Sequence, residues 1–318
     1  PGEETLDPII PETTKAISTE DCGAYLVSID TTDMSFTFNS DILDKYPIEV
    51  GDVIIVPVDR GYLRKVTAIE GQKDKGFIKI ITIMAKMGEA IKQGQLDFNY
   101  PMDTVIPITE IVQQSGNAAL KVEGNLTLAA TLHGTLQMKD WSVHKFDINS
   151  DLTETFVLSG TCTYDILTQG YEKKVFDHKF PSRKFLIGNV PVIITPVLKI
   201  YIGDSCKVQS QVTSSITQVC ALTTGMTSQD GNWTIRNPEL KPDLTASPPT
   251  CSAKADLQVW VKPQLTFEFY GITGPYVNDR VYLQLEANTL EDPWWKLNYG
   301  MDFAMGIDME LFDIDNWE

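Results

Sequence analysis

Residues 126–138 read LTLAATLHGTLQM. Apolar side chains occupy the even positions of this stretch apart from Gly134, and the odd positions are mostly polar. A period of two is typical of a β-strand with one buried and one solvent-facing side. At roughly 3.3 Å per residue the stretch would span about 43 Å, far more than an average strand. It therefore predicts either a long curved strand or two strands separated by a bulge at Gly134.

The same alternation returns at residues 190–202, 257–269 and 281–287. Pro196 and Pro263 lie inside two of these stretches and mark further candidate bulges. Alternation favours antiparallel sheets, because buried parallel strands read as continuous apolar runs. Helical periodicity is confined to residues 84–92. The predicted fold class is all-β: a small N-terminal β barrel or sandwich, and a larger antiparallel β-sandwich domain with long strands and one short helix.

The length of 318 residues allows two domains. We expect an extended N-terminal arm over residues 1–22, a small β domain over 23–112 and a large antiparallel β domain over 118–318. The polar stretch QQSGN at residues 113–117 is the predicted linker between the two domains. The arm is rich in proline and acidic residues, and it serves either as a linker or as a strand donated to a neighbour.

The charge and the motifs exclude several classes of function. With 26 Lys+Arg against 43 Asp+Glu, the formal net charge is −17, which argues against a nucleic-acid partner. The sequence contains no run of 18 apolar residues, so no transmembrane segment is predicted. No phosphate-binding glycine loop, nucleophile elbow or zinc-protease motif is present, and there are only three histidines. We therefore expect a protein that is not an enzyme.

Five cysteines are present, without a CxxC pair, so no zinc site is predicted. Cys206, Cys220 and Cys251 fall within one stretch rich in Ser, Thr, Gly and Pro, and they are the candidates for a disulfide. An odd number of cysteines leaves at least one thiol free or paired between chains. For Cys22 and Cys162, burial as free thiols is the alternative.

Acidic residues offer two kinds of site. Paired carboxylates on neighbouring strands would suit a glycoside hydrolase, but no spacing selects one pair among 43 acids. Asp313 and Asp315 are the candidate ligands of a calcium ion, because period-two spacing places them on one strand face. No other cofactor is predicted.

Aromatic residues offer a binding surface. Trp260 and Tyr270 fall on the polar side of their alternating stretch, and the adjacent Trp294 and Trp295 would face opposite sides of a strand. Exposed aromatic rings can stack on sugar rings or anchor a protein interface. The alternative is a second layer of structure that covers this side.

Several short segments resemble a known pattern. The segments VGDVI at 50–54, GYLRKV at 61–66, GNVPV at 188–192 and FYGITGPY at 269–276, with residues 81–93, are similar to a pattern in an uncharacterised family of bacterial secreted or surface-anchored β-rich proteins. The resemblance spans most of residues 45–300. It implies an extracellular β-rich protein, located there after removal of a signal peptide, and it implies no activity.

The first functional hypothesis is therefore an extracellular structural or interaction protein that assembles with copies of itself by strand addition, as a fibre or layer subunit. The second is an adhesin module that binds carbohydrate or a host surface through Trp260, Tyr270, Trp294 or Trp295. The third is a glycoside hydrolase.

Overall fold

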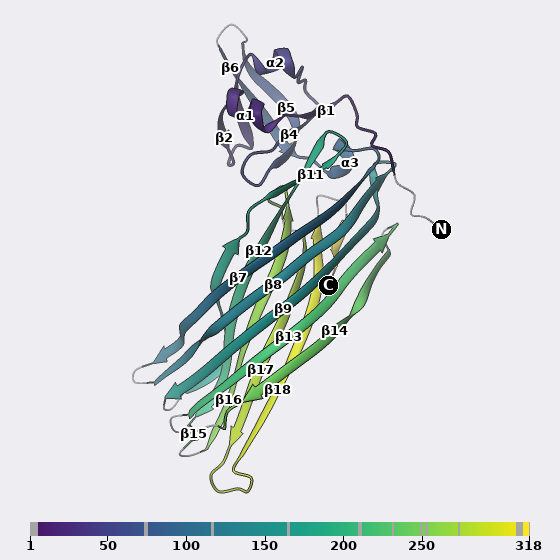
Figure 1. Cartoon of the computed structure of the whole chain (residues 1–318). Helices are drawn as coiled ribbons and strands as arrows, with labels where there is room; N and C mark the ends of the chain where they lie inside the picture. Colours follow the sequence, from purple (N-terminus) through teal and green to yellow (C-terminus); the bar gives the residue numbers. More distant parts are fainter. Residues whose placement is uncertain are drawn as a thin grey trace, which may run out of the picture.

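The computed structural model describes residues 6–72, 76–115, 118–163, 166–208, 212–230, 232–248, 250–251, 254–272, 274–309 and 314–317. Strands make up 71% of the chain and helices 6%, which confirms the all-β class. A small N-terminal sheet stands at one end of a long two-layered sandwich (Figure 1). None of the described helices is long and apolar enough to cross a bilayer.

The small sheet has six strands in the order β1-β4-β5-β6-β3-β2, antiparallel except for the β1–β4 pair. Helices α1 and α2 pack against this sheet and cover a core built around Phe36, Phe38 and Ile80. The elements are β1 (Thr14–Ala16), α1 (Thr19–Tyr25), β2 (Leu26–Asp30), β3 (Ser35–Asn39), α2 (Ile42–Lys45), β4 (Val53–Val56), β5 (Tyr62–Gln72) and β6 (Phe77–Met84).

Strand β4 is buried on both sides, because it lies between two cores. Ile54 and Val56 belong to the core under α1 and α2, whereas Val53 and Ile55 belong to the core of the sandwich. The small sheet therefore packs directly on the end of the sandwich.

The sandwich has two sheets, which we call the front sheet and the back sheet. The front sheet runs in the order β14-β13-β9-β8-β7, with β15 beside β13. The back sheet runs in the order β10-β12-β16-β17-β18-β19, with β11 beside β12. Helix α3 (Met87–Ala90) links the small sheet to β7. The strands are β7 (Gly94–Ser115), β8 (Ala118–Lys139), β9 (Ser142–Thr163), β10 (Ile166–Lys179), β11 (Arg183–Ile187), β12 (Val190–Val208), β13 (Val212–Gln229), β14 (Asn232–Ala246), β15 (Thr250–Cys251), β16 (Ala255–Phe269), β17 (Pro275–Ala287), β18 (Trp295–Met309) and β19 (Ile314–Trp317).

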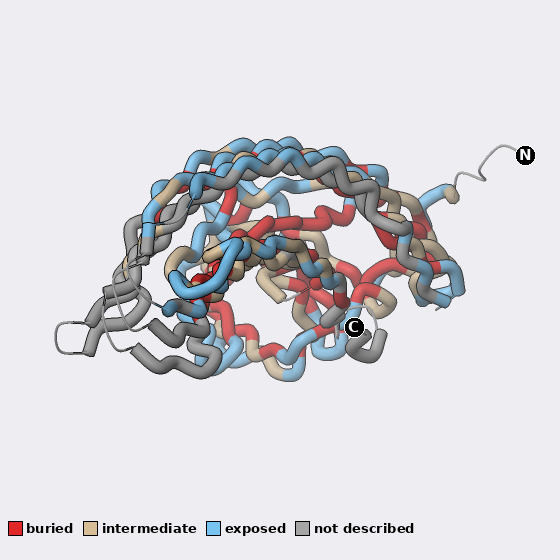
Figure 2. Tube along the Cα trace, turned by 90° about the horizontal axis from the view of Figure 1, so that it is seen from below, coloured by how far each residue is buried: buried red, intermediate tan, exposed pale blue. Residues whose placement is uncertain are grey.

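Residues 126–138 form part of the single long strand β8, not two strands. The pairing of β8 with β9 runs through Gly134 without a change of register. The apolar even positions of this stretch are buried, as their alternation predicts: Leu126, Leu128, Ala130, Leu132, Leu136 and Met138. Strands β7, β8 and β9 each have 22 residues, which corresponds to about 75 Å at roughly 3.4 Å per residue. Figure 2 shows buried positions on the inner sides of the curved layers and exposed positions outside.

Prolines lie where the sheets offer their N–H groups no partner. Pro196 falls in the gap where β12 changes its neighbour from β11 to β10, and Pro263 falls where the β16–β17 ladder is interrupted. The two edges of the front sheet, β7 and β14, carry two prolines each. Proline on an edge strand removes no ladder hydrogen bond and discourages pairing with another chain.

The predicted domain boundaries differ from the structure at both ends of the small domain. Within the predicted arm, Thr14–Ala16 pair with β4 and Thr19–Tyr25 form a helix. Ahead of them, the Ile9 N–H donates to the Gln93 carbonyl at 2.8 Å. The described part of the arm is thus docked on its own chain, because the parallel edge of β4 offers it hydrogen bonds.

The small domain also ends earlier than predicted. Strand β7 already belongs to the sandwich and begins at Gly94, and residues 113–115 of the predicted linker are its last residues. Hairpin turns and linkers share a polar, glycine-containing composition, so composition alone did not distinguish them.

Candidate functional site

Tyr270 is buried where the small domain contacts the sandwich, a region that we call the joint and that includes Gly61 and Ile193. Its prediction as an exposed binding residue is therefore wrong. It is 3% exposed and lies in the turn after β16. Its hydroxyl donates to the Pro191 carbonyl at 2.6 Å, and its N–H donates to the Ile193 carbonyl at 3.0 Å. Burial raises the pKa of the Tyr270 phenol well above its usual value. Alternation along one strand could not reveal that another domain lies against this turn.

The joint also contains a close backbone approach and an ion pair. Arg60 Nη1 lies 2.7 Å from Glu268 Oε2. Next to it, Gly61 has a φ of +78°, and a Cβ atom there would collide with the side chain of Ile193. The partly exposed ion pair contributes little free energy. The glycine is therefore the residue that permits the contact.

Trp260 lies on the outer side of the back sheet, yet its ring is not free to bind. It is 7% exposed, and a Cβ atom at Gly203 on the neighbouring strand would collide with its ring. The guanidinium of Arg280 covers the ring at 4.6 Å from its centroid, and the indole N–H donates to Glu172 at 3.2 Å. The sequence analysis offered a second layer of structure as the alternative cover for this ring. In the structure Gly203 makes room for the ring and the side chain of Arg280 covers it. The binding role predicted for Trp260 is therefore wrong.

Trp294 and Trp295 do line a cavity. Both are half-buried against the sandwich core, with ring centroids 6.3 Å apart and planes at 66°. The cavity has a volume of about 240 Å³. We call it the tip pocket, because residues of the β17–β18 loop line it and this loop lies at the end of the molecule remote from the small domain (Figure 1). Its lining residues are Lys254, Asp256, Glu286, Ala287, Asn288, Glu291, Pro293, Trp294, Trp295 and Lys296.

The register of three strands places the charges of the tip pocket. Asp256 on β16 pairs with Glu286 on β17, and Glu286 pairs with Lys296 on β18. Directly opposed residues have Cβ atoms about 4.5–5.5 Å apart, so the three side chains form one row on the outer face. In the loop, Asn288 Nδ2 donates to Glu291 Oε1 at 2.6 Å, which fixes the loop carboxylate.

The tip pocket and Tyr270 lie at opposite ends of β16. The fifteen residues of that strand correspond to about 50 Å at roughly 3.4 Å per residue. The four predicted aromatic residues therefore form no common site. The charged members of the tip pocket were missed as a group, because the register that joins them depends on where the β17–β18 hairpin turns. Ala287 and Trp295 are the last pair of the β17–β18 ladder, and the seven residues between them form the loop. Recognising that pair would have located the turn.

The side chains of the two predicted calcium ligands lie outside the described set. Asp313 lies outside the described residues, and Asp315 lies in β19 without a described side chain. Within the described part of the chain no group of three or more His, Cys, Asp or Glu side chains could hold a metal ion. Calcium at this position stays a prediction.

The side chains of the three disulfide candidates are likewise outside the described set, but their strand positions are known. Cys251 pairs with Val212, and Cys220 lies eight residues further along β13, which corresponds to about 27 Å. Cys206 belongs to the other sheet. A disulfide between Cys220 and Cys251 would require a different register, because bridged Cα atoms lie less than about 7 Å apart.

Cys22 is the cysteine whose side chain is described, and it is a buried free thiol. Burial raises its pKa to about 11, so the thiol stays protonated near neutral pH. A protonated, buried thiol is a poor nucleophile.

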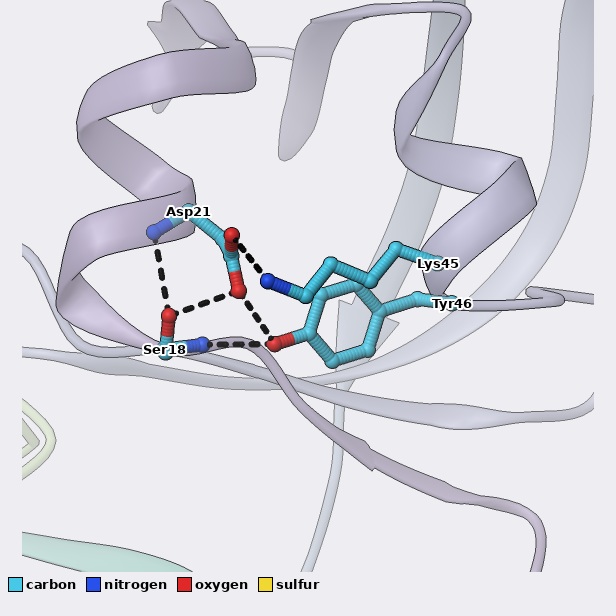
Figure 3. A network of polar contacts seen from close by, with 4 residues as sticks. All are labelled: Ser18, Asp21, Lys45 and Tyr46. Atoms are coloured by element: carbon cyan, nitrogen blue, oxygen red, sulfur yellow. Dashed lines mark hydrogen bonds and ion pairs between the residues drawn. The ribbon is translucent and has the colours of Figure 1, made fainter.

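A closed polar network fastens α1 to α2 in the small domain (Figure 3). Ser18 caps α1 by accepting from the Asp21 N–H at 3.0 Å, and its hydroxyl donates to Asp21 Oδ2 at 2.7 Å. Lys45 donates to Asp21 Oδ1 at 2.7 Å, and the Tyr46 hydroxyl donates to Oδ2 at 2.7 Å. The Asp21 carboxylate accepts from the side chains of Ser18, Lys45 and Tyr46, and these hydrogen bonds lower its pKa, so it is a weak base toward the Ser18 hydroxyl. The network is structural.

These hydrogen bonds, that of Lys45 foremost, lower the pKa of Asp21 from 3.8 to about 2. A carboxyl whose pKa is lowered on folding stabilises the fold above its unfolded pKa, and this contribution disappears as the pH falls through the folded value. Asp21→Asn should therefore show a smaller fall in melting temperature between about pH 5 and pH 2 than the wild type. Asp41→Asn, at an exposed acid without a capping bond, is the control and should follow the wild type. Parallel curves for Asp21→Asn and the wild type would contradict the role of the network.

No protein-family model, no curated protein and no solved structure matches this chain.

Proposed function

We propose that this chain is an extracellular binding protein whose tip pocket takes a carbohydrate. The observation that carries the proposal is the juxtaposition of Trp294 and Trp295 with a row of charged side chains in one cavity. A sugar ring has apolar C–H faces, which pack on indole rings, and hydroxyl edges, which hydrogen-bond to carboxylates and amides. The extracellular location rests on the segments that resemble secreted bacterial proteins.

The size of the tip pocket favours a single terminal sugar unit. Its volume of about 240 Å³ lies below the roughly 300–1,000 Å³ of pockets that enclose drug-sized ligands. Because Asn288 holds Glu291 in place, one acceptor at the rim is ordered before a ligand arrives. An ordered acceptor lowers the entropic cost of binding.

Binding is favoured over hydrolysis. Asp256 and Glu286 are directly opposed on β16 and β17, but both side chains are exposed to water. A glycosidase keeps one carboxyl protonated by means of an apolar environment. The exposed pair is better suited to accepting hydrogen bonds from hydroxyl groups.

A glycan array followed by calorimetry with the strongest ligand tests the proposal. Trp294→Ala and Trp295→Ala should each weaken binding at least about 30-fold, the loss of a hot-spot residue. Glu286→Gln and Glu291→Gln, at residues whose side chains face solvent, should weaken it without affecting folding. Tyr299→Ala removes an exposed aromatic ring of the same strand outside the pocket and is the control.

A wild-type chain that binds no glycan on the array would refute the proposal. So would binding that survives in all four pocket variants.

Self-assembly by strand addition has less support. The described part of the arm is docked on its own chain, and both edges of the front sheet carry prolines. Of the described strands, β14 pairs with β13 alone and β7 with β8 alone, so addition to the front sheet would occur at these two proline-containing edges. Filaments in electron micrographs of the purified chain would restore this hypothesis.

A further inference from the structure

A second depression lies on the outer face of the front sheet, far from the aromatic rings of the tip. Its volume is about 210 Å³. Its lining residues include Asp147, Asn149, Gly225, Thr227, Thr234 and Arg236. We call it the sheet depression.

Strand register explains why the face is hollow here. Gly225 on β13 pairs with Asn149 on β9 and with Arg236 on β14. The central residue of this row has no side chain, so the Asn149 amide reaches over it toward Arg236. Thr227 lies between Asp147 and Thr234 in the next row on the same face. The depression therefore has a glycine floor and polar walls.

Asn149 directs an unused acceptor into the gap. Its Nδ2 donates to Asp147 Oδ1 at 2.7 Å, and since an ionised carboxylate only accepts, the amide nitrogen must be on that side. Its Oδ1 is buried and has no hydrogen-bond partner. A Cβ atom at Gly225 would lie 2.5 Å from this Oδ1, so the oxygen lies directly over the floor. Buried acceptors normally have a donor, and each exception calls for an explanation.

The opposite wall supplies a positive charge. Arg236 is exposed, and it forms no ion pair with any residue that the structure describes. Guanidinium groups bind carboxylates through two parallel hydrogen bonds. Across the gap, the Asp147 carboxylate adds negative charge beside the Asn149 oxygen, which favours a cationic donor over a neutral one.

We propose that the sheet depression binds a small zwitterion of the amino-acid type. Its ammonium group pairs with Asp147 beside the Asn149 amide, and its carboxylate pairs with Arg236. Gly225 leaves the space into which the Asn149 amide extends, and Thr227 and Thr234 border the depression. This site does not depend on the carbohydrate site at the tip.

Calorimetric titration of the full chain with L-serine tests the proposal, with acetate and ethylamine as probes for each charge alone. L-serine should bind saturably, and each single-charge probe should bind at least tenfold more weakly. Asn149→Ala and Arg236→Gln should each weaken L-serine binding at least tenfold. Arg236 is exposed, so its variant should fold normally. Lys121→Gln changes a cation on the same sheet, paired with Glu123, and should leave binding unchanged.

Absence of L-serine binding to the wild type would overturn the proposal. Glucuronate binding without L-serine binding would also overturn it, because an acidic sugar carries no ammonium group. Equal loss of affinity in Lys121→Gln and Arg236→Gln would show general charge attraction in place of a site.

Discussion

Phe146→Ala should lower the free energy of unfolding by about 3–5 kcal/mol, the range for truncation of a fully buried phenylalanine. Phe146 on β9 is 0% exposed, and its ring centroid lies 6.2 Å from that of Phe269 on β16. This contact joins the front sheet to the back sheet. The cavity left by alanine would lie between two layers of long strands, which cannot collapse locally to fill it. Urea unfolding of the variant and the wild type measures the loss.

Val157→Ala is the matched control, because Val157 lies on the same strand with its side chain outside the core, 39% exposed. Its loss should stay within about 0.5 kcal/mol. A shift of one residue in strand register would exchange the inner and outer faces. Equal losses in the two variants would therefore contradict the register of β9.

Gly61→Ala should also destabilise the protein strongly, by about 2–5 kcal/mol. About 1–2 kcal/mol of this comes from placing a Cβ at a φ of +78°, and about 1–3 kcal/mol from overpacking against Ile193. The collision lies in the joint between the small domain and the sandwich. The change should therefore also increase proteolysis between β6 and β7, where residues 85–93 connect the two parts.

Gly51→Ala separates the two contributions. Gly51 has a φ of +98°, and a Cβ atom there would have no atom within 4 Å. It should show the backbone cost without the collision, and proteolysis between β6 and β7 should not change. If Gly61→Ala were no more destabilising than Gly51→Ala, the packing of Ile193 against this turn would be wrong.

The long strands were the most predictable part of the molecule. Alternation over residues 126–138 depends only on which side of one strand faces the core, and each strand carries that information in its own sequence. The prolines of β7 and β14 carry similar local information about sheet edges, since proline is excluded from most central positions.

The residues that were misplaced depend on contacts between distant segments. Trp260 lies on the outer side of β16 and Tyr270 in the turn after it, but an arginine from β17 covers the first and the small domain approaches the second at Gly61. Asp21 and Lys45 are joined only because two short helices lie next to each other on the small sheet. Neither helix has a period long enough to be detected in the sequence.

The candidate site was half predictable for the same reason. Trp294 and Trp295 could be selected from the sequence because they are adjacent. Asp256 becomes their neighbour only through the pairing of β16 with β17, which the sequence does not show. The sheet depression depends on an absent side chain at Gly225, flanked by strands from two other segments. A single glycine in a strand indicates a bulge or a close approach, and here it opens a gap.

Strands β7, β8 and β9 run continuously along the sandwich, away from the small domain. A pulling force between the two ends of the sandwich would act parallel to the strands, so neighbouring strands would have to slide past each other. Rows of backbone hydrogen bonds loaded in this way share the load and must break together, whereas a perpendicular force would open them one at a time. The length of β7, β8 and β9 thus gives the molecule mechanical resistance along the axis that separates its two ends.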